Sequence, residues 1–155
     1  MIETKDTNPK DAVGVRKAPL STVPFPVLLE TGVAMLEGAR KYGRHNYRVI
    51  GVRGSVYYDA VMRHLGAWWE GEDIDPDSGI SHVTKAIAGL VVLRDSMMRE
   101  NWEDDRPPKS PKFVSKLSFR AAEVIEKYPD ALPPFTEQNR SNPCPPSTPC
   151  PPTST

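Results

Sequence analysis

Residues 81–100 read SHVTKAIAGLVVLRDSMMRE, a stretch with the length and the apolar spacing of a packed α-helix. We expect Asp77 or Ser78 to begin this helix, because short polar side chains favour helix N-caps. One face of the helix should carry its larger apolar side chains and pack on neighbouring helices, namely Val83, Ile87, Leu90, Val91 and Met98.

Two helices are expected before this one. Pro26 suits the first turn of a helix over residues 26–42, and Gly43 stands where a C-cap belongs. The apolar residues Leu29, Val33 and Leu36 recur along it at helical spacing. A second helix is predicted to begin at Ser55 as its cap and to end at Gly71.

A fourth, shorter helix is expected over residues 118–128, with Ser118 as its cap. The stretch RVIGVRGSVYY, residues 48–58, is rich enough in β-branched and aromatic residues to leave a hairpin open. No longer strand pattern occurs, so the prediction is an all-α bundle of about four helices. The first two dozen residues are expected to be extended, since prolines stand at positions 9, 19 and 24.

The composition limits the function and the location of the chain. Its 155 residues include 20 basic and 20 acidic side chains, so no net charge attracts nucleic acid or an anionic membrane. No apolar run has the length of a signal peptide or a membrane span, which favours a cytoplasmic protein without a membrane partner. Length favours one domain over residues 1–132. Residues 133–155 hold eight of the 17 prolines and are expected to be disordered, with Cys144 and Cys150 as incidental thiols.

Carboxylates on the first predicted helix are the first candidates for chemistry. Glu30 and Glu37 lie seven residues apart, so both project from nearly one face. A solvated face is one interpretation. The other is a site facing the bundle, where carboxylates are costly unless they are paired or bind a metal.

Acidic residues also gather between the second and third predicted helices. Residues 70–77, EGEDIDPD, hold five of them, including Glu72 and Asp75. A solvated acidic turn is the simpler interpretation, and a site for a hard cation such as Mg²⁺ or Mn²⁺ is the alternative.

Histidines and a basic segment lie near these acids. His64 and His82 can meet if the second and third helices pack antiparallel, although a single helical histidine is more often structural. Trp68 and Trp69 point about 100° apart, so one can stack on a base, although core packing of both is slightly favoured. Residues 37–48, EGARKYGRHNYR, can bind phosphates and a base, or form an ordinary basic helix end. No Walker loop, GxGxxG, GxSxG or HExxH motif occurs, so covalent catalysis has no candidate.

Three segments together resemble a known family. TNPKDAVGVRKAPLSTVP (7–24), LEGARKYGRHNYR (36–48) and RHLGAWWEGEDIDPDSGISH (63–82) are similar, in this order, to phage dATP/dGTP diphosphohydrolases. That family is described as similar to the MazG-like all-α nucleoside triphosphate pyrophosphohydrolases, and the resemblance extends from about Thr7 to Asp95. Neither of the MazG-like metal motifs, Glu-x-x-Glu and Glu-x-x-Asp, occurs on the helices predicted over residues 26–42 and 81–100, and His82 and Lys85 stand where the second would fall.

The resemblance implies a helical homo-oligomer that uses Mg²⁺ or Mn²⁺ to hydrolyse dGTP or dATP to the monophosphate and pyrophosphate, which adjusts the deoxynucleotide pool during phage infection. Together with the candidates above, it suggests a set of site residues. The metal ligands would be Glu30, Glu37, Glu72 and Asp75; proton transfer or catalysis would involve Glu37, His64 and His82; and the substrate would contact Lys41, Tyr42, Arg44, Asn46, Arg63, Trp69 and Lys85. Two other functions stay open: a nucleotide-binding module without turnover, and a small helical interaction protein whose proline-rich tail engages a partner.

Overall fold

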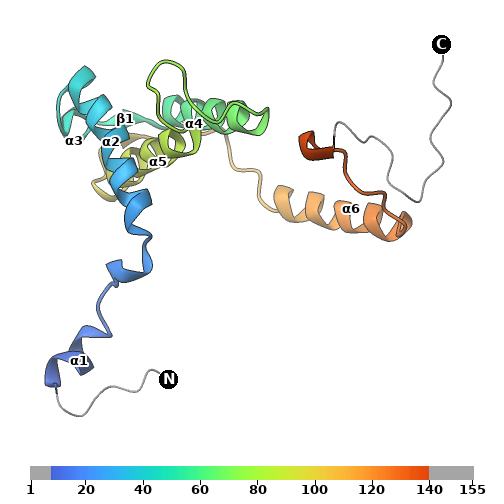
Figure 1. Ribbon diagram of the computed structural model, residues 1–155, viewed down its shortest axis with the longest axis horizontal. Helices are drawn as coiled ribbons and strands as arrows, with labels where there is room; N and C mark the ends of the chain where they lie inside the picture. The colour runs from blue at the N-terminus through green and yellow to red at the C-terminus, as the bar shows by residue number, and fades with distance from the viewer. Residues whose placement is uncertain (1–7, 140–155) are drawn as a thin grey trace. The chain divides into compact units, whose positions relative to one another are not determined.

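The computed structural model of the chain describes residues 8–139, which form two compact units that divide between Pro107 and Pro108. The first unit contains, in chain order, α1 (Pro9–Gly14), a short 3₁₀ helix (Leu20–Thr22), α2 (Phe25–Tyr42), α3 (Asn46–Ile50), β1 (Val52–Arg53), α4 (Gly54–Trp69), α5 (His82–Met98) and β2 (Trp102–Glu103). The second contains α6 (Phe113–Lys127) and a 3₁₀ helix (Glu137–Asn139). The predicted all-α class is therefore confirmed (Figure 1).

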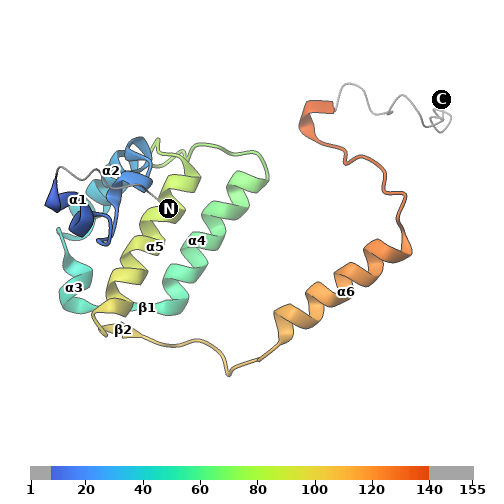
Figure 2. The same ribbon diagram turned by 90° about the horizontal axis from the view of Figure 1, so that it is seen from below.

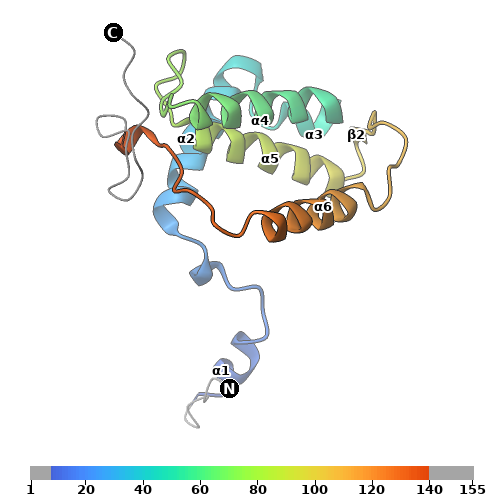
Figure 3. The ribbon, with the colours of Figure 1, turned by 90° about the vertical axis from the view of Figure 1, so that its right-hand side faces the viewer.

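The centre of the first unit is α5, which lies between α4 on one side and α2 and α3 on the other (Figure 2). The chain leaves the far end of α4, turns through residues 70–81 and returns along α5, so these two helices are antiparallel neighbours. Figure 3 shows the same pair side by side from another direction. Both predicted histidine positions, one on each helix, can therefore meet.

The helix faces that pack together carry small side chains, contrary to the prediction. On α5 the buried apolar residues are Ala86, Ala88 and Val92, whereas Leu90, Val91 and Met98 are exposed. On α2 the buried residues are Thr31 and Ala34, and Leu29, Val33 and Leu36 are exposed. A Cβ placed on Gly89 would lie 3.1 Å from the Val61 side chain, so α4 and α5 approach too closely for large residues between them.

The predicted beginnings of two helices are also wrong, and for α4 a distant residue supplies the capping contacts. Gly54 begins α4, and Ser55 is already inside the first turn. The Ser55 amide and hydroxyl both donate to the Asp105 carboxylate, the amide at 2.8 Å. Ser81, not Asp77 or Ser78, is the N-cap of α5.

Both predicted glycine ends are confirmed. Gly43 follows α2 with φ +91°, and its amide donates to the Ala39 carbonyl. At the end of α4, Gly71 has φ +99°, and the amides of Gly71 and Glu72 donate to the carbonyls of Trp68 and Ala67, each at 3.0 Å. This pair of hydrogen bonds is the Schellman motif, which fixes the backbone of Glu72 relative to α4.

The segment considered for a hairpin forms instead the short α3 and one strand of a two-stranded parallel ladder, in which Val52 pairs with Trp102. Gly51 has φ +84°, and a Cβ there would lie 2.2 Å from the Asn101 carbonyl oxygen. The Asn101 side-chain amide, three residues after the end of α5, donates to the carbonyls of Tyr47 and Arg48 in α3. These hydrogen bonds hold α3 beside the end of α5. The hairpin that the sequence left open does not form here, because the partner strand of β1 lies 50 residues further along the chain, at Trp102.

The N-terminal segment is less extended than predicted. Pro9 begins α1, and the Asn8 side chain accepts a hydrogen bond from the Lys10 amide at 3.0 Å. The expected disordered tail, residues 133–155, lies outside the described residues from position 140 onward, with both cysteines. The domain boundary expected after residue 132 stays a prediction. Among the described helices, none is long and apolar enough to span a membrane.

The second unit has no buried side chain within residues 108–138. Its helix begins at Phe113, five residues before the predicted cap, with Lys112 as N-cap. Ser118 lies inside the helix, where its hydroxyl donates to the Val114 carbonyl at 2.9 Å. The predicted beginning of this helix is therefore wrong.

Candidate active site

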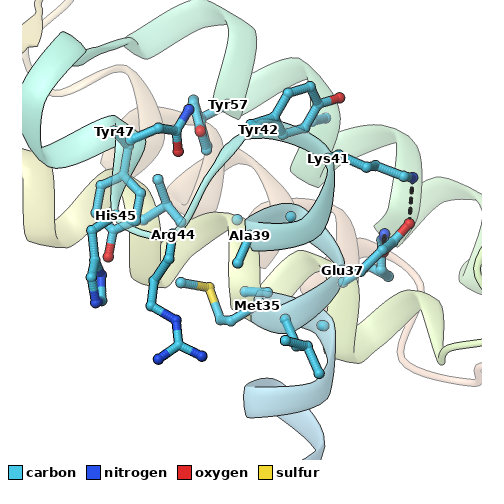
Figure 4. A pocket seen from close by; sticks show the side chains of 18 of the residues that line it. Met35, Glu37, Ala39, Lys41, Tyr42, Arg44, His45, Tyr47 and Tyr57 are labelled. Carbon is cyan, nitrogen blue, oxygen red and sulfur yellow. Dashed lines mark hydrogen bonds and ion pairs between the residues drawn. The ribbon is translucent and has the colours of Figure 1, made fainter.

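An open cavity of about 500 Å³ lies in the first unit. Apolar residues of α2, α4 and α5 line it, among them Ala34, Val61, Ala88 and Val92. Charged and polar side chains come from the end of α2, from the segment that follows it and from the facing sides of α4 and α5. Figure 4 shows Lys41 and Tyr42 at one end of the labelled set and His45 and Tyr47 at the other. A cavity of this size with few polar groups is typical of a small-molecule site.

Glu37 is the central charged group of the cavity. Lys41, one turn along α2, donates to one carboxylate oxygen at 2.5 Å (Figure 4). Lys85 of α5 donates to the other oxygen. Hydrogen bonds from Lys41 and then Lys85 lower the pKa of Glu37, which keeps this carboxyl ionised. The side chains of Glu37 and Lys85 are each 19% exposed, so Glu37 does not lie on a solvated face.

Glu30 faces α5 as well. Its carboxylate accepts a hydrogen bond from the Thr84 hydroxyl at 2.7 Å. The two glutamates of α2 therefore contact neighbouring residues of α5, Thr84 and Lys85, as expected for carboxylates seven residues apart on one helix. Sequence inspection did not select Thr84, because a threonine inside a helix gives no signal of a partner 54 positions away.

The loop between α4 and α5 holds Asp75 beside this group. The Ser78 hydroxyl donates to Asp75 Oδ2 at 2.6 Å, and the Asp75 amide donates to the Ile80 carbonyl at 2.9 Å. The hydrogen bond from Ser78 is the main cause that lowers the pKa of Asp75, and Lys85 contributes. Asp75 Oδ2 lies 3.9 Å from Lys85 Nζ, so one ammonium group faces the carboxylates of both Glu37 and Asp75.

His64 and His82 meet across α4 and α5, as the antiparallel arrangement predicted. Their Nδ1 atoms lie 2.8 Å apart. Burial lowers the pKa of His64, His82 lowers it further, and Asp75 opposes the shift. Glu72 lies beyond the end of α4, with Oε2 3.5 Å from His82 Nε2.

Seven of the thirteen predicted site residues line the cavity: Glu37, Lys41, Tyr42, Arg44, Asn46, His64 and Lys85. Glu30, Glu72, Asp75 and His82 contact members of this group or its neighbours, as described above. Arg63 and Trp69 are not among the lining residues. Trp68 is 41% and Trp69 78% exposed, so the expectation that both pack in the core is wrong.

Two further tyrosines line the cavity, Tyr47 and Tyr57. Tyr47 lies in the basic segment 37–48 that the sequence singled out, whereas Tyr57 was missed, because its spacing on α4 is that of an ordinary core residue. Burial raises the pKa of Tyr57, so its phenol stays protonated and can donate a hydrogen bond. With Tyr42, these rings give the cavity several surfaces on which a flat ring can stack.

The carboxylates fit one kind of divalent metal site. Within residues 8–139, no three His, Cys, Asp or Glu side chains converge as ligands of an all-protein metal site do. Mg²⁺ is usually bound by one or two carboxylates together with substrate phosphates and water. Glu37 and Asp75, which face one ammonium group, fit a cation that arrives with a phosphate ligand.

Comparisons with known proteins give one family and one relative. The family described as "dATP/dGTP diphosphohydrolase, N-terminal" matches residues 7–106. A protein of Salmonella phage PMBT28 named dATP/dGTP diphosphohydrolase is 31% identical over 90 residues, which cover 58% of this chain and 30% of that protein. The chain therefore spans less than a third of this curated relative. No solved structure matches.

Proposed function

Because the chain belongs to the family described as dATP/dGTP diphosphohydrolase, N-terminal, we propose that it hydrolyses purine deoxynucleoside triphosphates to the monophosphate and pyrophosphate. The observation that carries this proposal is the cavity, where Glu37 lies between two lysines. In a phage-infected cell, the reaction would take place in the host cytoplasm and adjust the deoxynucleotide pool.

The residues of the cavity suit the parts of such a substrate. Lys41, Arg44 and Lys85 supply cationic groups for the triphosphate. Tyr42 and Tyr57 offer rings for stacking of the purine, and Asn46 offers an amide for its polar edge. The apolar side chains around them limit the access of water, which strengthens these polar contacts.

We propose Mg²⁺ or Mn²⁺ as cofactor, held by Glu37 and Asp75 together with phosphate oxygens. When bound, such an ion neutralises phosphate charge and favours attack of water at phosphorus. Lys85 would then exchange its contact with the two carboxylates for one with the phosphates, so the same ammonium group serves both states. Glu30 and Glu72 stay predicted ligands; in the structure they contact Thr84 and His82.

A homo-oligomer is proposed as well. Large apolar side chains of α2 and α5 are exposed in the single chain, including Leu29, Val33, Leu36, Leu90 and Met98. Exposed apolar residues in this number are more typical of a surface covered by a partner than of a free surface. Sedimentation equilibrium of the full chain tests this, and a monomer at micromolar concentration would contradict it.

The direct test of the reaction is incubation of the chain with dGTP and dATP in the presence of Mn²⁺, followed by assays for pyrophosphate and the monophosphate. Release of pyrophosphate, and its loss in Glu37→Gln, is the expected result. Glu126→Gln on α6 is the control, because Glu126 is not among the residues that line the cavity. Release of inorganic phosphate with the diphosphate as product would instead indicate a phosphatase.

A second function, a nucleotide-binding module without turnover, is favoured by one observation. Within residues 8–139, no three His, Cys, Asp or Glu side chains converge as ligands of a metal site. This alternative predicts that dGTP raises the melting temperature of the chain in the presence of Mn²⁺ while the nucleotide stays intact. Pyrophosphate release by the chain alone would exclude it.

A further inference from the structure

Three ionisable side chains form a line that leads from the surface into the cavity. Glu72, with a side chain 53% exposed, lies 3.5 Å from His82 Nε2. His82 is 5% exposed, and its Nδ1 lies 2.8 Å from Nδ1 of His64, which lines the cavity. Backbone hydrogen bonds hold both residues of the Glu72–His82 contact in place. The Glu72 amide donates to the Ala67 carbonyl, and the His82 amide donates to the Asp73 carbonyl.

Proton counting decides which nitrogen atoms of the two rings are protonated. Two neutral imidazoles whose Nδ1 atoms are 2.8 Å apart share one proton between them, so one ring donates and the other accepts. If His82 Nδ1 donated, the neutral His82 would have a bare Nε2 facing the Glu72 carboxylate, and two acceptors would oppose each other. Within the described chain, His82 Nε2 is buried without a hydrogen bond, which leaves Glu72, 3.5 Å away, as its acceptor after a small side-chain movement.

We propose that Glu72 acts through His82 to hold His64 as the Nδ1–H tautomer, so that His64 Nε2 serves as the base for the attacking water. The inference rests on the proposed function. His82 carries its proton on Nε2 toward Glu72 and accepts the His64 Nδ1 proton. Glu72 and His82 are positioning residues, and only His64 meets the reacting atoms.

The proposed step is the attack of a water molecule on the α-phosphorus of the nucleotide. The oxygen of a water molecule forms a bond to the α-phosphorus, and the bond from this phosphorus to the oxygen that bridges to the β-phosphorus breaks. Pyrophosphate leaves with that bond's electron pair. His64 Nε2 takes a proton from the water and becomes an imidazolium, whose charge Glu72 offsets through His82.

The charged groups around His64 come from each element packed against it. Arg63 precedes it on α4 and His82 contacts it from α5, while Lys85 of α5 and Asp75 of the loop act on it electrostatically. Glu72 adds a negative charge behind His82. Two cations and two carboxylates therefore surround the histidine pair, and the tautomer is decided by the contact at each nitrogen rather than by the net charge.

The first test measures the tautomers in the full chain without nucleotide. Long-range ¹H–¹⁵N spectra, recorded well above the usual histidine pKa of about 6.5, should show His64 protonated on Nδ1 and His82 on Nε2. Glu72→Gln should keep this pattern, because the amide oxygen still accepts a hydrogen bond from His82 Nε2–H, whereas Glu72→Ala should lose it. Glu70→Gln, in the same exposed turn, is the matched control. A parent protein with His64 protonated on Nε2 overturns the inference, whether or not nucleotide is hydrolysed.

The second test separates positioning from metal binding. Glu72→Gln should lower kcat by up to about tenfold with little change in KM, and move the acidic limb of the kcat profile to lower pH, because the imidazolium loses its counter-charge. Mn²⁺ should raise the melting temperature of this variant as much as that of the parent. Loss of that metal stabilisation would make Glu72 a ligand and overturn the inference. If the parent protein shows the expected tautomers but releases no pyrophosphate, the proposed function is wrong. The role of His64 as a base is then wrong as well.

Discussion

The interaction between Glu37 and Lys85 gives a quantitative test of the candidate site. Two unit charges about 4 Å apart attract by roughly 4 kcal/mol at an effective dielectric constant near 20, before the costs of desolvation and ordering. Lys85 lies within hydrogen-bond distance of Glu37 and 3.9 Å from Asp75, and the side chains of Glu37 and Lys85 are only 19% exposed. Exposed pairs contribute about 0–1 kcal/mol, and hydrogen bonds to charged groups about 1.5–3 kcal/mol. We therefore expect a coupling free energy of about 1–2 kcal/mol.

A double-mutant cycle with Glu37→Gln and Lys85→Met measures this coupling from urea unfolding of the four proteins. The control is the cycle of Arg53→Met and Glu103→Gln, a pair 3.0 Å apart with side chains 56% and 60% exposed. It should give a clearly smaller coupling, because both side chains are exposed and screened by solvent. A Glu37–Lys85 coupling no larger than that of the control would show that the ammonium group is not a partly buried counter-ion, and Lys85 would then not be a group that a metal ion replaces.

Three further predictions concern the fold, the metal and the pH dependence. Gly51→Ala should lower the free energy of unfolding by about 2 kcal/mol or more, because φ is +84° and a Cβ would lie 2.2 Å from the Asn101 carbonyl oxygen. Gly66→Ala, with open space around it, should cost nothing, and equal urea midpoints for the two variants would contradict this reasoning. Lys85→Met should bind Mn²⁺ more tightly than the parent without nucleotide, as measured by calorimetry, since no ammonium group competes for the carboxylates; weaker binding would count against the proposed ligands. The folded-state pKa of His64 lies below its usual value of 6.5, so its contribution to stability is present above that pH and is lost as the pH falls below it. The urea midpoint of the parent should therefore fall more than that of His64→Gln from pH 7 to about 5.5, above the range in which the carboxylates titrate, and parallel falls would refute it.

Local signals in the sequence determined the main helices. Gly43 and Gly71 end α2 and α4 because glycine adopts the positive φ that a helix C-terminus requires, and this preference depends only on neighbouring residues. The basic segment 37–48 was selected for its side-chain chemistry, and Lys41, Tyr42, Arg44 and Asn46 all line the cavity. The order of three segments also indicated the family, which the match over residues 7–106 confirms.

Contacts between distant residues were decided only by the tertiary structure. Asp105 caps the first turn of α4 in place of a local serine, and Trp102 pairs with Val52, because both partners become neighbours only when α5 returns the chain. Helical periodicity identified apolar faces, but it did not show which face is buried. Because α4 and α5 approach closely, alanines of α5 are buried between the helices and Leu90 is exposed. The pairing of His64 with His82 also depends on contacts between distant residues. The sequence shows that both histidines are present, but only the packing of α4 against α5 brings their Nδ1 atoms within hydrogen-bond range.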